Sequence, residues 1–284
     1  MAKDKITEYD SVADNNTDVG GVNLAENSMN PSDVNNALRE LMSHQKEGLG
    51  SGTPLYVDQT NNRVGVGTAS PSQSLEVAGN IFVNTSGNPN LTVKTSGAGN
   101  NPTIRIQADT NYWDLQTLFS NSTDDLDFQY NGTSTMKIDN AGHITKPLQP
   151  AFQAHPSSTQ TNLANGTTIA FGTERFDNNA DFASNTFTAP VTGKYQINAN
   201  VSLVDVDSSA NFVGILVLSS NRAYYAYHGT GGFDSDVSFL EMSVNQLIDM
   251  DANDTVYVIF HQNGGTQQTD IHEDITNFSG YLVA

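Results

Sequence analysis

Residues 194–203 have the sequence Lys194-Tyr195-Gln196-Ile197-Asn198-Ala199-Asn200-Val201-Ser202-Leu203. Apolar and polar residues alternate throughout, which predicts a β-strand with one buried face. Further strands are expected at residues 211–218, 223–227, 237–248 and 255–260. Their spacing, with turn residues between them, favours an all-β sandwich over residues 148–284. Residues 255–260 are apolar on both faces, so we expect that strand to be central or covered by another subunit.

The preceding stretch, residues 51–147, contains short strand-like segments separated by Asn-Gly, Ser-Gly and Gly-Asn turns. The expected segments are residues 63–68, 74–83, 91–93, 103–107, 125–130 and 135–138. Each has only two or three apolar residues at period two, too few to close a core within one chain. The sequence therefore predicts a β shaft in which neighbouring chains supply the missing cover, as in a trimer.

Residues 1–50 predict an extended polar arm followed by one short helix. Pro31, Ser32 and Asp33 begin the helix, with Ser32 as the expected N-cap and Gly48 as the stop. One apolar stripe follows the helical period through Val34, Ala37, Leu38, Leu41 and Met42. Because so short a helix is marginal alone, the stripe needs a partner. Three alternatives supply that partner: the stripe packs on its own chain, it associates with other copies, or it docks to a larger particle.

The composition excludes several classes of protein. Twelve Lys and Arg residues stand against 31 Asp and Glu residues, a net charge of −19. Such a chain is not expected to bind nucleic acid or anionic lipid. It contains no cysteine, so it has no disulfide or Cys–zinc site. No segment is long and apolar enough for a membrane span, and no secretory leader is evident, so we expect synthesis in a host cytoplasm without membrane insertion.

Catalytic motifs are weak. The sequence lacks a GxSxG elbow, and Gly65-Val66-Gly67 fails the GxGxxG spacing of a dinucleotide loop. The acidic group Asp124, Asp125 and Asp127 contains pairs that could serve a glycosidase, although solvated turn residues are the ordinary explanation. We therefore expect that the protein is not an enzyme. A short polysaccharide depolymerase remains an alternative.

No cofactor is expected apart from a candidate calcium ion. Its possible ligands are Asp249, Asp251 and Asp254, which cluster within six residues. Calcium takes six to eight oxygen ligands from carboxylates and carbonyls. Asp254 has the competing interpretation of a turn residue that opens the next strand.

Candidate receptor contacts lie in the last third of the chain. Aromatic side chains stack on sugars or pack against proteins, and polar loops commonly carry binding residues. The candidates are Tyr224, Tyr225, Tyr227, His228, Phe233, Gln262, Asn263, Gln267 and Gln268. Packing between subunits is the alternative explanation for the tyrosine run.

The C-terminal half resembles the jelly-roll head of the complement-component and tumour-necrosis-factor superfamily. The matching segments are residues 151–154, 169–171, 176–178, 185–190, 192–195, 253–257 and 277–283. This resemblance implies a homotrimer that binds ligands at its apex or flanks. The collagen-like Gly-X-Y stalk of that family is missing here.

The rest of the chain resembles bacteriophage tail fibres. Residues 30–42 are similar to their virion-attachment segment, and residues 62–71, 75–80 and 136–144 are similar to their shaft units. The resemblance implies an arm (1–50) that binds other tail or virion proteins, a shaft (51–147) and a receptor-binding head (148–284). The implied location is the virion tail.

Together these observations predict a mostly β homotrimer with an N-terminal arm and one short helix, a trimeric β shaft of short strands and a C-terminal jelly-roll β-sandwich. Its expected function is attachment of a phage to a host surface polysaccharide or outer-membrane protein, because three identical heads convert weak contacts into strong binding. A structural fibre or decoration protein of a capsid or baseplate, without receptor binding, is the other alternative.

Overall fold

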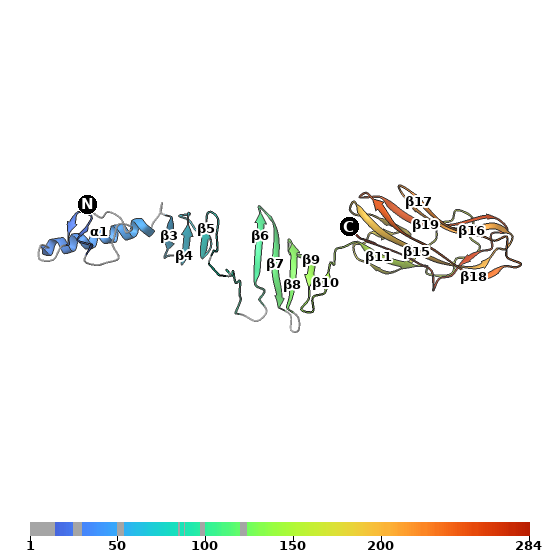
Figure 1. Cartoon of the computed structure of the whole chain (residues 1–284), viewed down its shortest axis with the longest axis horizontal. Helices are drawn as coiled ribbons and strands as arrows, with labels where there is room; N and C mark the ends of the chain where they lie inside the picture. Colours follow the sequence, from blue (N-terminus) through green and yellow to red (C-terminus); the bar gives the residue numbers. More distant parts are fainter. Residues whose placement is uncertain are drawn as a thin grey trace. The chain divides into compact units, whose positions relative to one another are not determined.

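The structure, a computed structural model, describes residues 15–24, 30–49, 54–84, 86–87, 89–96, 100–119 and 124–284 (Figure 1). By its internal contacts the chain divides into two compact units, Met1–Thr92 and Val93–Ala284. Much of the predicted arm, residues 1–14 and 25–29, lies outside the described residues. No helix in the described ranges is both long and apolar enough to cross a membrane.

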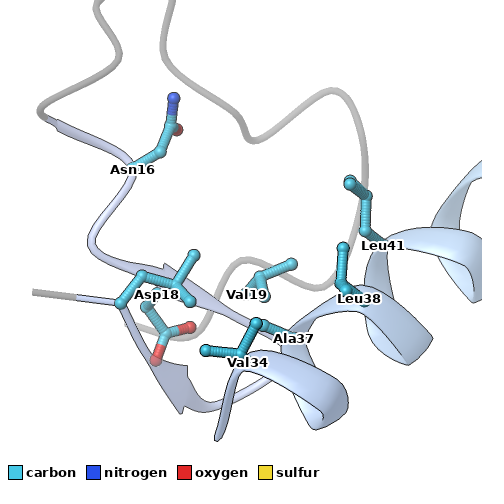
Figure 2. Close-up of a pocket in the computed structure, with 8 residues that line it drawn as sticks. Asn16, Asp18, Val19, Val34, Ala37, Leu38 and Leu41 are labelled. Atoms are coloured by element: carbon cyan, nitrogen blue, oxygen red, sulfur yellow. The ribbon is translucent and has the colours of Figure 1, made fainter. Parts of the chain in front are cut away.

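The first unit begins with a small hairpin and the predicted helix. The elements are β1 (Asp18–Val19), β2 (Val22–Asn23) and α1 (Pro31–Leu49). The hairpin and helix line an open apolar pocket of about 370 Å³, whose lining residues include Val19, Leu24 and Ala37 (Figure 2). Val19 and Ala37 are buried, whereas Leu38 and Met42 remain 56% and 69% exposed. The hairpin therefore covers only part of the predicted apolar stripe.

The N-cap of α1 differs from the prediction. Asn30, not Ser32, precedes the first helical residue, and Pro31 occupies the first helical position, where its missing N–H costs nothing. The backbone N–H of Asn30 donates to Asp33 Oδ2 at 3.1 Å, and the Asn30 side-chain amide donates to the same oxygen at 3.3 Å. Both bonds run from Asn30 to the Asp33 carboxylate, so Ser32 lies inside the first turn.

Three short strands complete the described part of this unit: β3 (Leu55–Asp58), β4 (Arg63–Val66) and β5 (Leu75–Val77). β3 and β4 are antiparallel, whereas β4 and β5 are parallel. The chain crosses between β4 and β5 in eight residues, and Arg63 Nη1 donates to the Pro71 carbonyl at 2.8 Å to brace the crossing. Gly67 supplies the left-handed turn after β4, with φ of +73°.

The predicted strands at residues 81–83 and 91–93 are wrong. β5 ends at Val77, and the described residues between there and Val93 form no strand. Ile81 and Phe82 are 73% and 85% exposed. Alternating apolar residues favour a strand only where another strand is available to pair with them, and among the described residues these have none.

The second unit begins with a five-stranded antiparallel sheet in the order β10-β9-β8-β7-β6. Its strands are β6 (Thr103–Ala108), β7 (Asn111–Phe119), β8 (Asp124–Tyr130), β9 (Thr133–Ile138) and β10 (Ile144–Thr145). β7, the longest of them, was not among the predicted segments, because Asp114 and Gln116 interrupt its apolar run.

The rest of this unit is a two-layer β-sandwich. The inner sheet has the order β12-β11-β21-β15-β18, with β20 pairing β15, and the outer sheet has the order β13-β14-β19-β16-β17 (Figure 1). The bounds are β11 (Ala151–His155), β12 (Thr173–Asp177), β13 (Phe182–Ala183), β14 (Thr186–Thr188), β15 (Gly193–Val206), β16 (Ala210–Ser219), β17 (Ala223–Gly229), β18 (Val237–Met250), β19 (Thr255–Gly264), β20 (Asp270–Ile271) and β21 (Asn277–Leu282).

The core between the two sheets is built on stacked phenylalanines. Phe152 of β11 stacks on Phe187 of β14 at a centroid distance of 4.8 Å, and Phe278 of β21 meets Phe152 edge-on at 5.0 Å. The predicted inward face of β15 is fully buried from Tyr195 to Leu203. Because β21 pairs with both β11 and β15, the end of the chain is central to the inner sheet. A mostly β fold with one helix and a C-terminal jelly-roll sandwich is thereby confirmed.

Candidate functional site

The outward face of the outer sheet is aromatic and uncharged. β16, β17 and β19 contain no Asp, Glu, Lys or Arg, although the whole chain has a net charge of −19. Tyr225 and Tyr227 of β17 are 58% and 45% exposed on this face. Cross-strand register places them beside outward residues of β16 and β19: Phe212, Gly214, Leu216, Leu218, Tyr257, Ile259 and His261. We call this set, with Tyr225 and Tyr227, the outer face.

A glycine at the centre of the outer face lets two side chains meet across a strand. Gly214 of β16 lies opposite Tyr227 on one side and His261 on the other. A Cβ atom at Gly214 would stand 2.2 Å from Tyr227 Cδ1. The Tyr227 ring therefore lies over the glycine, and its hydroxyl reaches His261 Nδ1 at 2.8 Å.

Ring contacts extend this pair into a cluster. Phe212 lies 5.0 Å from Tyr227 and 5.3 Å from His261, and Tyr225 lies 5.4 Å from Tyr227, all between ring centroids. Partial burial, followed by the neighbouring Tyr225, raises the pKa of the Tyr227 phenol. The hydroxyl consequently stays protonated at neutral pH. The cluster combines flat apolar rings with a hydroxyl and an imidazole, the chemistry that recognises a polar ligand with an apolar face.

The other predicted aromatic contacts lie elsewhere. Tyr224 alternates to the opposite side of β17 and packs on the core. His228 is exposed and stacks on Phe233 at 5.3 Å, while Phe233 itself packs partly against the core. The structure thus brings Tyr225 and Tyr227 together and places Tyr224, His228 and Phe233 outside the outer face.

A buried carboxylate organises the loops at one end of the sandwich. Asp207 is 1% exposed and accepts hydrogen bonds from Ser209, Gln262, Thr266 and Gln267. Burial alone would raise its pKa, but the bonds from Ser209 and Thr266 outweigh burial and lower the pKa to about 2. Asp207 therefore fixes the loop after β19 through these hydrogen bonds.

This hydrogen-bond network determines which of the predicted polar contact residues face solvent. Gln262 is 2% exposed, and its amide bonds Asp207 at 3.0 Å and Thr269 at 2.9 Å. It therefore holds the loop from inside and does not face solvent. Gln268 donates to Asp236 at 2.5 Å. Gln267 is exposed on this loop, and Asn263 is exposed at the end of β19, where it accepts a bond from Asn211 at 2.7 Å and pairs in register with Phe212 of the outer face.

The outward face of the inner sheet has a different character. Neutral amide and hydroxyl side chains occupy its centre, and they bond one another: Gln196 to Asn198 at 2.9 Å, and Ser243 to Asn200 at 2.9 Å. Leu247 of β18 and Tyr281 of β21 flank Gln196 in register. These two are 53% and 47% exposed. We call Leu247, Gln196 and Tyr281 the inner row.

The predicted calcium ligands do not form a site. No group of three or more carboxylate or imidazole ligands converges anywhere in the described ranges. Asp254 Oδ2 accepts the Asp251 backbone N–H at 2.9 Å and the Asn221 amide at 2.6 Å. Asp249 lies opposite Lys194 in the β15–β18 pair. Asp254 is thus the turn residue of the alternative interpretation.

Phe212 and His261 are site residues that sequence reasoning missed. Each stands alone in its own strand, whereas the tyrosines form a visible run. Both residues could have been found from the sequence by comparing two strands. The alternation of residues 210–219 and that of residues 255–264 place Phe212 and His261 on one face when the two strands pair.

Comparison with known proteins identifies the sandwich. Residues 151–283 match the family model described as C1q domain. The chain has no match among curated proteins.

Three of the solved structures that are similar to this chain each cover 48% of it. The globular domain of zebrafish complement 1qA is 18% identical, with a TM-score of 0.35, covering 48% of this chain and 98% of its own. Murine APRIL is 9% identical, with a TM-score of 0.37 and coverages of 48% and 99%. The TNF protein Eiger from S. frugiperda is 9% identical, with a TM-score of 0.37 and coverages of 48% and 91%.

Proposed function

On the premise that residues 151–283 form a C1q-like jelly-roll domain, we propose that this chain is a homotrimeric bacteriophage tail fibre whose head binds a host cell surface. Domains of this class typically self-associate as homotrimers and are generally ligand-binding or structural rather than enzymatic. The N-terminal arm, residues 1–50, attaches the fibre to other tail or virion proteins. The fibre is located in the virion tail.

The observation that carries the receptor-binding role is the outer face. Clusters of exposed aromatic residues mark interaction sites, and tyrosine is enriched at them. Here the cluster lies on three strands without a single charge, in a chain that is otherwise strongly acidic. An uncharged face allows the head to approach a surface without the repulsion that its net charge would otherwise cause.

The inner row supports self-association of the head. Leu247 and Tyr281 present apolar surface beside Gln196. Paired neutral amides lie on one side of this row, and Lys194 lies opposite Asp249 on the other. The two apolar side chains are removed from water when a second copy covers them. Three heads held on one axis then present three outer faces, and their combined binding exceeds that of any single face.

The attachment role rests on α1. Val34, Leu38, Leu41 and Met42 remain 37–69% exposed although the β1–β2 hairpin packs beside them. The uncovered part of the stripe offers an apolar contact for a partner protein or for the same helix of another copy. Attachment to the virion through residues 1–50 remains the proposal that fits the resemblance of residues 30–42.

Cell binding by the intact chain tests the function. A fluorescently labelled full chain is mixed with whole cells from a panel of bacterial strains, and bound label is measured by flow cytometry. We expect saturable binding to some strains and a loss of about tenfold or more for Tyr225→Ala with Tyr227→Ala, because few residues carry most of an interface's energy and three copies multiply the loss.

The matched control is Ile275→Ala, an apolar residue of similar exposure, 49%, outside both sheets. It should bind like the unmodified chain. A trimer that binds no strain in a broad panel would favour the alternative of a structural fibre or decoration protein. Binding accompanied by release of reducing sugars from cell-surface polysaccharide would favour the depolymerase alternative.

A further inference from the structure

The five-stranded sheet before the head has one continuous apolar face. Three cross-strand rows form it, and the register fixes their members. The first row is Ile106, Trp113 and Tyr130; the second is Ile104, Leu115, Phe128 and Met136; the third is Thr117, Leu126, Ile138 and Ile144. Trp113 and Tyr130 pack together at a centroid distance of 5.2 Å. We call these rows the shaft face.

The charged residues of the sheet lie mainly on its opposite side. Arg105 and Asp114 form a bidentate pair there, with both N···O distances 2.8 Å, and Arg105 also covers the Tyr112 ring at 3.8 Å. Asp127 is fully buried on that side and accepts bonds from Gln129 and Ser134. On the side of the shaft face, Asp124 is the only charged residue of these strands, and it lies at the end of β8.

Nothing in the described part of the chain covers the shaft face. Ile106 is 72% exposed, Ile144 is 61% exposed and Trp113 is 49% exposed. The five strands lie side by side in a single layer (Figure 1), and β6 to β10 contact one another in sequence. A sheet with one apolar face is stable only when that face is buried against another layer.

We propose that the shaft face is a self-association surface, and that the equivalent sheets of two further copies of this chain cover it. The inference rests on the proposed homotrimer and names a surface outside the head that completes it. Three sheets turn their shaft faces toward a common axis, so that the charged sides face solvent. The apolar rows of the three copies then form the core that one copy lacks.

Charge and chain connectivity favour copies of this chain over a foreign partner. Because the shaft face is uncharged apart from its margin, copies approach through it without the repulsion expected from a net charge of −19. Only residues 146–150 separate β10 from β11 of the head. Heads that trimerise therefore hold three of these sheets at a high effective concentration, where weak apolar contacts suffice.

The fluorescence of one tryptophan reports on the exposure of the shaft face. Trp113 is the only tryptophan of the chain and lies in the first row of the shaft face. Acrylamide quenching of the full-length chain therefore measures exposure of this surface alone. We expect a Stern–Volmer constant roughly threefold below that of free tryptophan amide, because close apolar packing excludes quencher.

Adjacent residues on opposite sides of β6 provide matched variants. Ile106→Glu places a charge on the shaft face, and Gln107→Glu places the same charge on the other side. We expect Ile106→Glu to raise the quenching constant to the free-amide value and Gln107→Glu to leave it unchanged. Circular dichroism checks that the head stays folded in both variants, which is expected because both positions lie outside it.

A crosslinking experiment gives an independent readout. Because the chain contains no cysteine, Ile106→Cys and Gln107→Cys each introduce a single reactive site. A short bismaleimide should produce covalent dimers from Ile106→Cys and none from Gln107→Cys.

Native mass separates the possible failures. A trimer whose Trp113 is quenched as readily as the free amide, and whose Ile106→Cys form does not crosslink, overturns the shaft-face inference while leaving the proposed function intact. A monomer by native mass overturns both.

Discussion

Asp207 shows how a single residue positions a loop. Its carboxylate is buried with neutral donors and no lysine or arginine, so its charge is held by hydrogen bonds alone. Gly265 makes room for it, since a Cβ there would lie 2.1 Å from Asp207 Oδ2, and its φ of +76° also favours glycine. Exposed Asn263 and Gln267 keep their positions because this buried carboxylate anchors the loop between them.

We expect acid to destabilise the head through Asp207. Its pKa falls from 3.8 in the unfolded chain to about 2 in the folded one, so the unfolded state takes up the proton first as pH drops. The stabilisation is complete above pH 4 and is lost between 3.8 and about 2; it amounts to about 2 kcal/mol. Thermal unfolding of Asp207→Asn should show a loss of that size at pH 7 and a flatter dependence below pH 4.

Asp205→Asn is the control for this prediction. Asp205 is exposed two residues away and has φ of +49°, a conformation that asparagine tolerates well. It should unfold like the unmodified chain at every pH. Equal effects of the two substitutions would contradict the role given to Asp207.

At the scale of elements, β16 depends on Gly214 for its pairing with β17. The glycine sits in an extended strand, so its role is space rather than an unusual backbone angle. A Cβ there would meet Tyr227 Cδ1 at 2.2 Å and the Ala226 carbonyl at 2.5 Å. Part of that clash is with backbone, which a rotamer change cannot relieve.

Gly214→Ala should therefore destabilise the head by about 1–3 kcal/mol, the usual range for overpacking. It should also displace the Tyr227 ring and separate its hydroxyl from His261. Differential scanning calorimetry measures the first effect, and the cell-binding assay measures the second. Gly229→Ala on β17 is the control, because a Cβ there meets no heavy atom within 4 Å. Indistinguishable variants would contradict the close approach at Gly214.

At the scale of the whole molecule, the head and the preceding sheet each have a face suited to other copies. Tyr281→Glu places a charge in the inner row of the head, where we expect it to prevent self-association, since an unpaired buried charge is strongly unfavourable. The residue is 47% exposed, so the fold of one copy should survive. Native mass spectrometry should show monomers, and binding to cells should fall with the loss of avidity.

Tyr225→Glu is the matched control for Tyr281→Glu. It makes the same substitution at an exposed tyrosine of the outer face. It should remain trimeric and lose cell binding. If Tyr225→Glu gave monomers and Tyr281→Glu gave trimers, the proposal would be contradicted. The outer face would then be the self-association surface, and the inner row would not be.

Local patterns in the sequence predicted those elements whose partners lie in the same chain. The alternation of residues 194–203 predicted β15, whose inward side chains are buried, and the apolar stripe from Val34 to Met42 predicted α1. Alternation failed at residues 81–83 and 91–93, because a strand needs another strand to accept its hydrogen bonds and the described residues supply none. The N-cap was misplaced by two residues because Pro31 favours the first helical position over the interior.

The sequence by itself determined the fold class and the position of the sandwich, since these follow from periodicity and composition. Only the tertiary structure decided which side chains share a face. Gln262 reads as a polar loop residue but is buried against Asp207, and Phe212 and His261 join Tyr227 only through the pairing of β16 with β17 and β19. Contacts between residues distant along the chain depend on strand register, which no local pattern encodes.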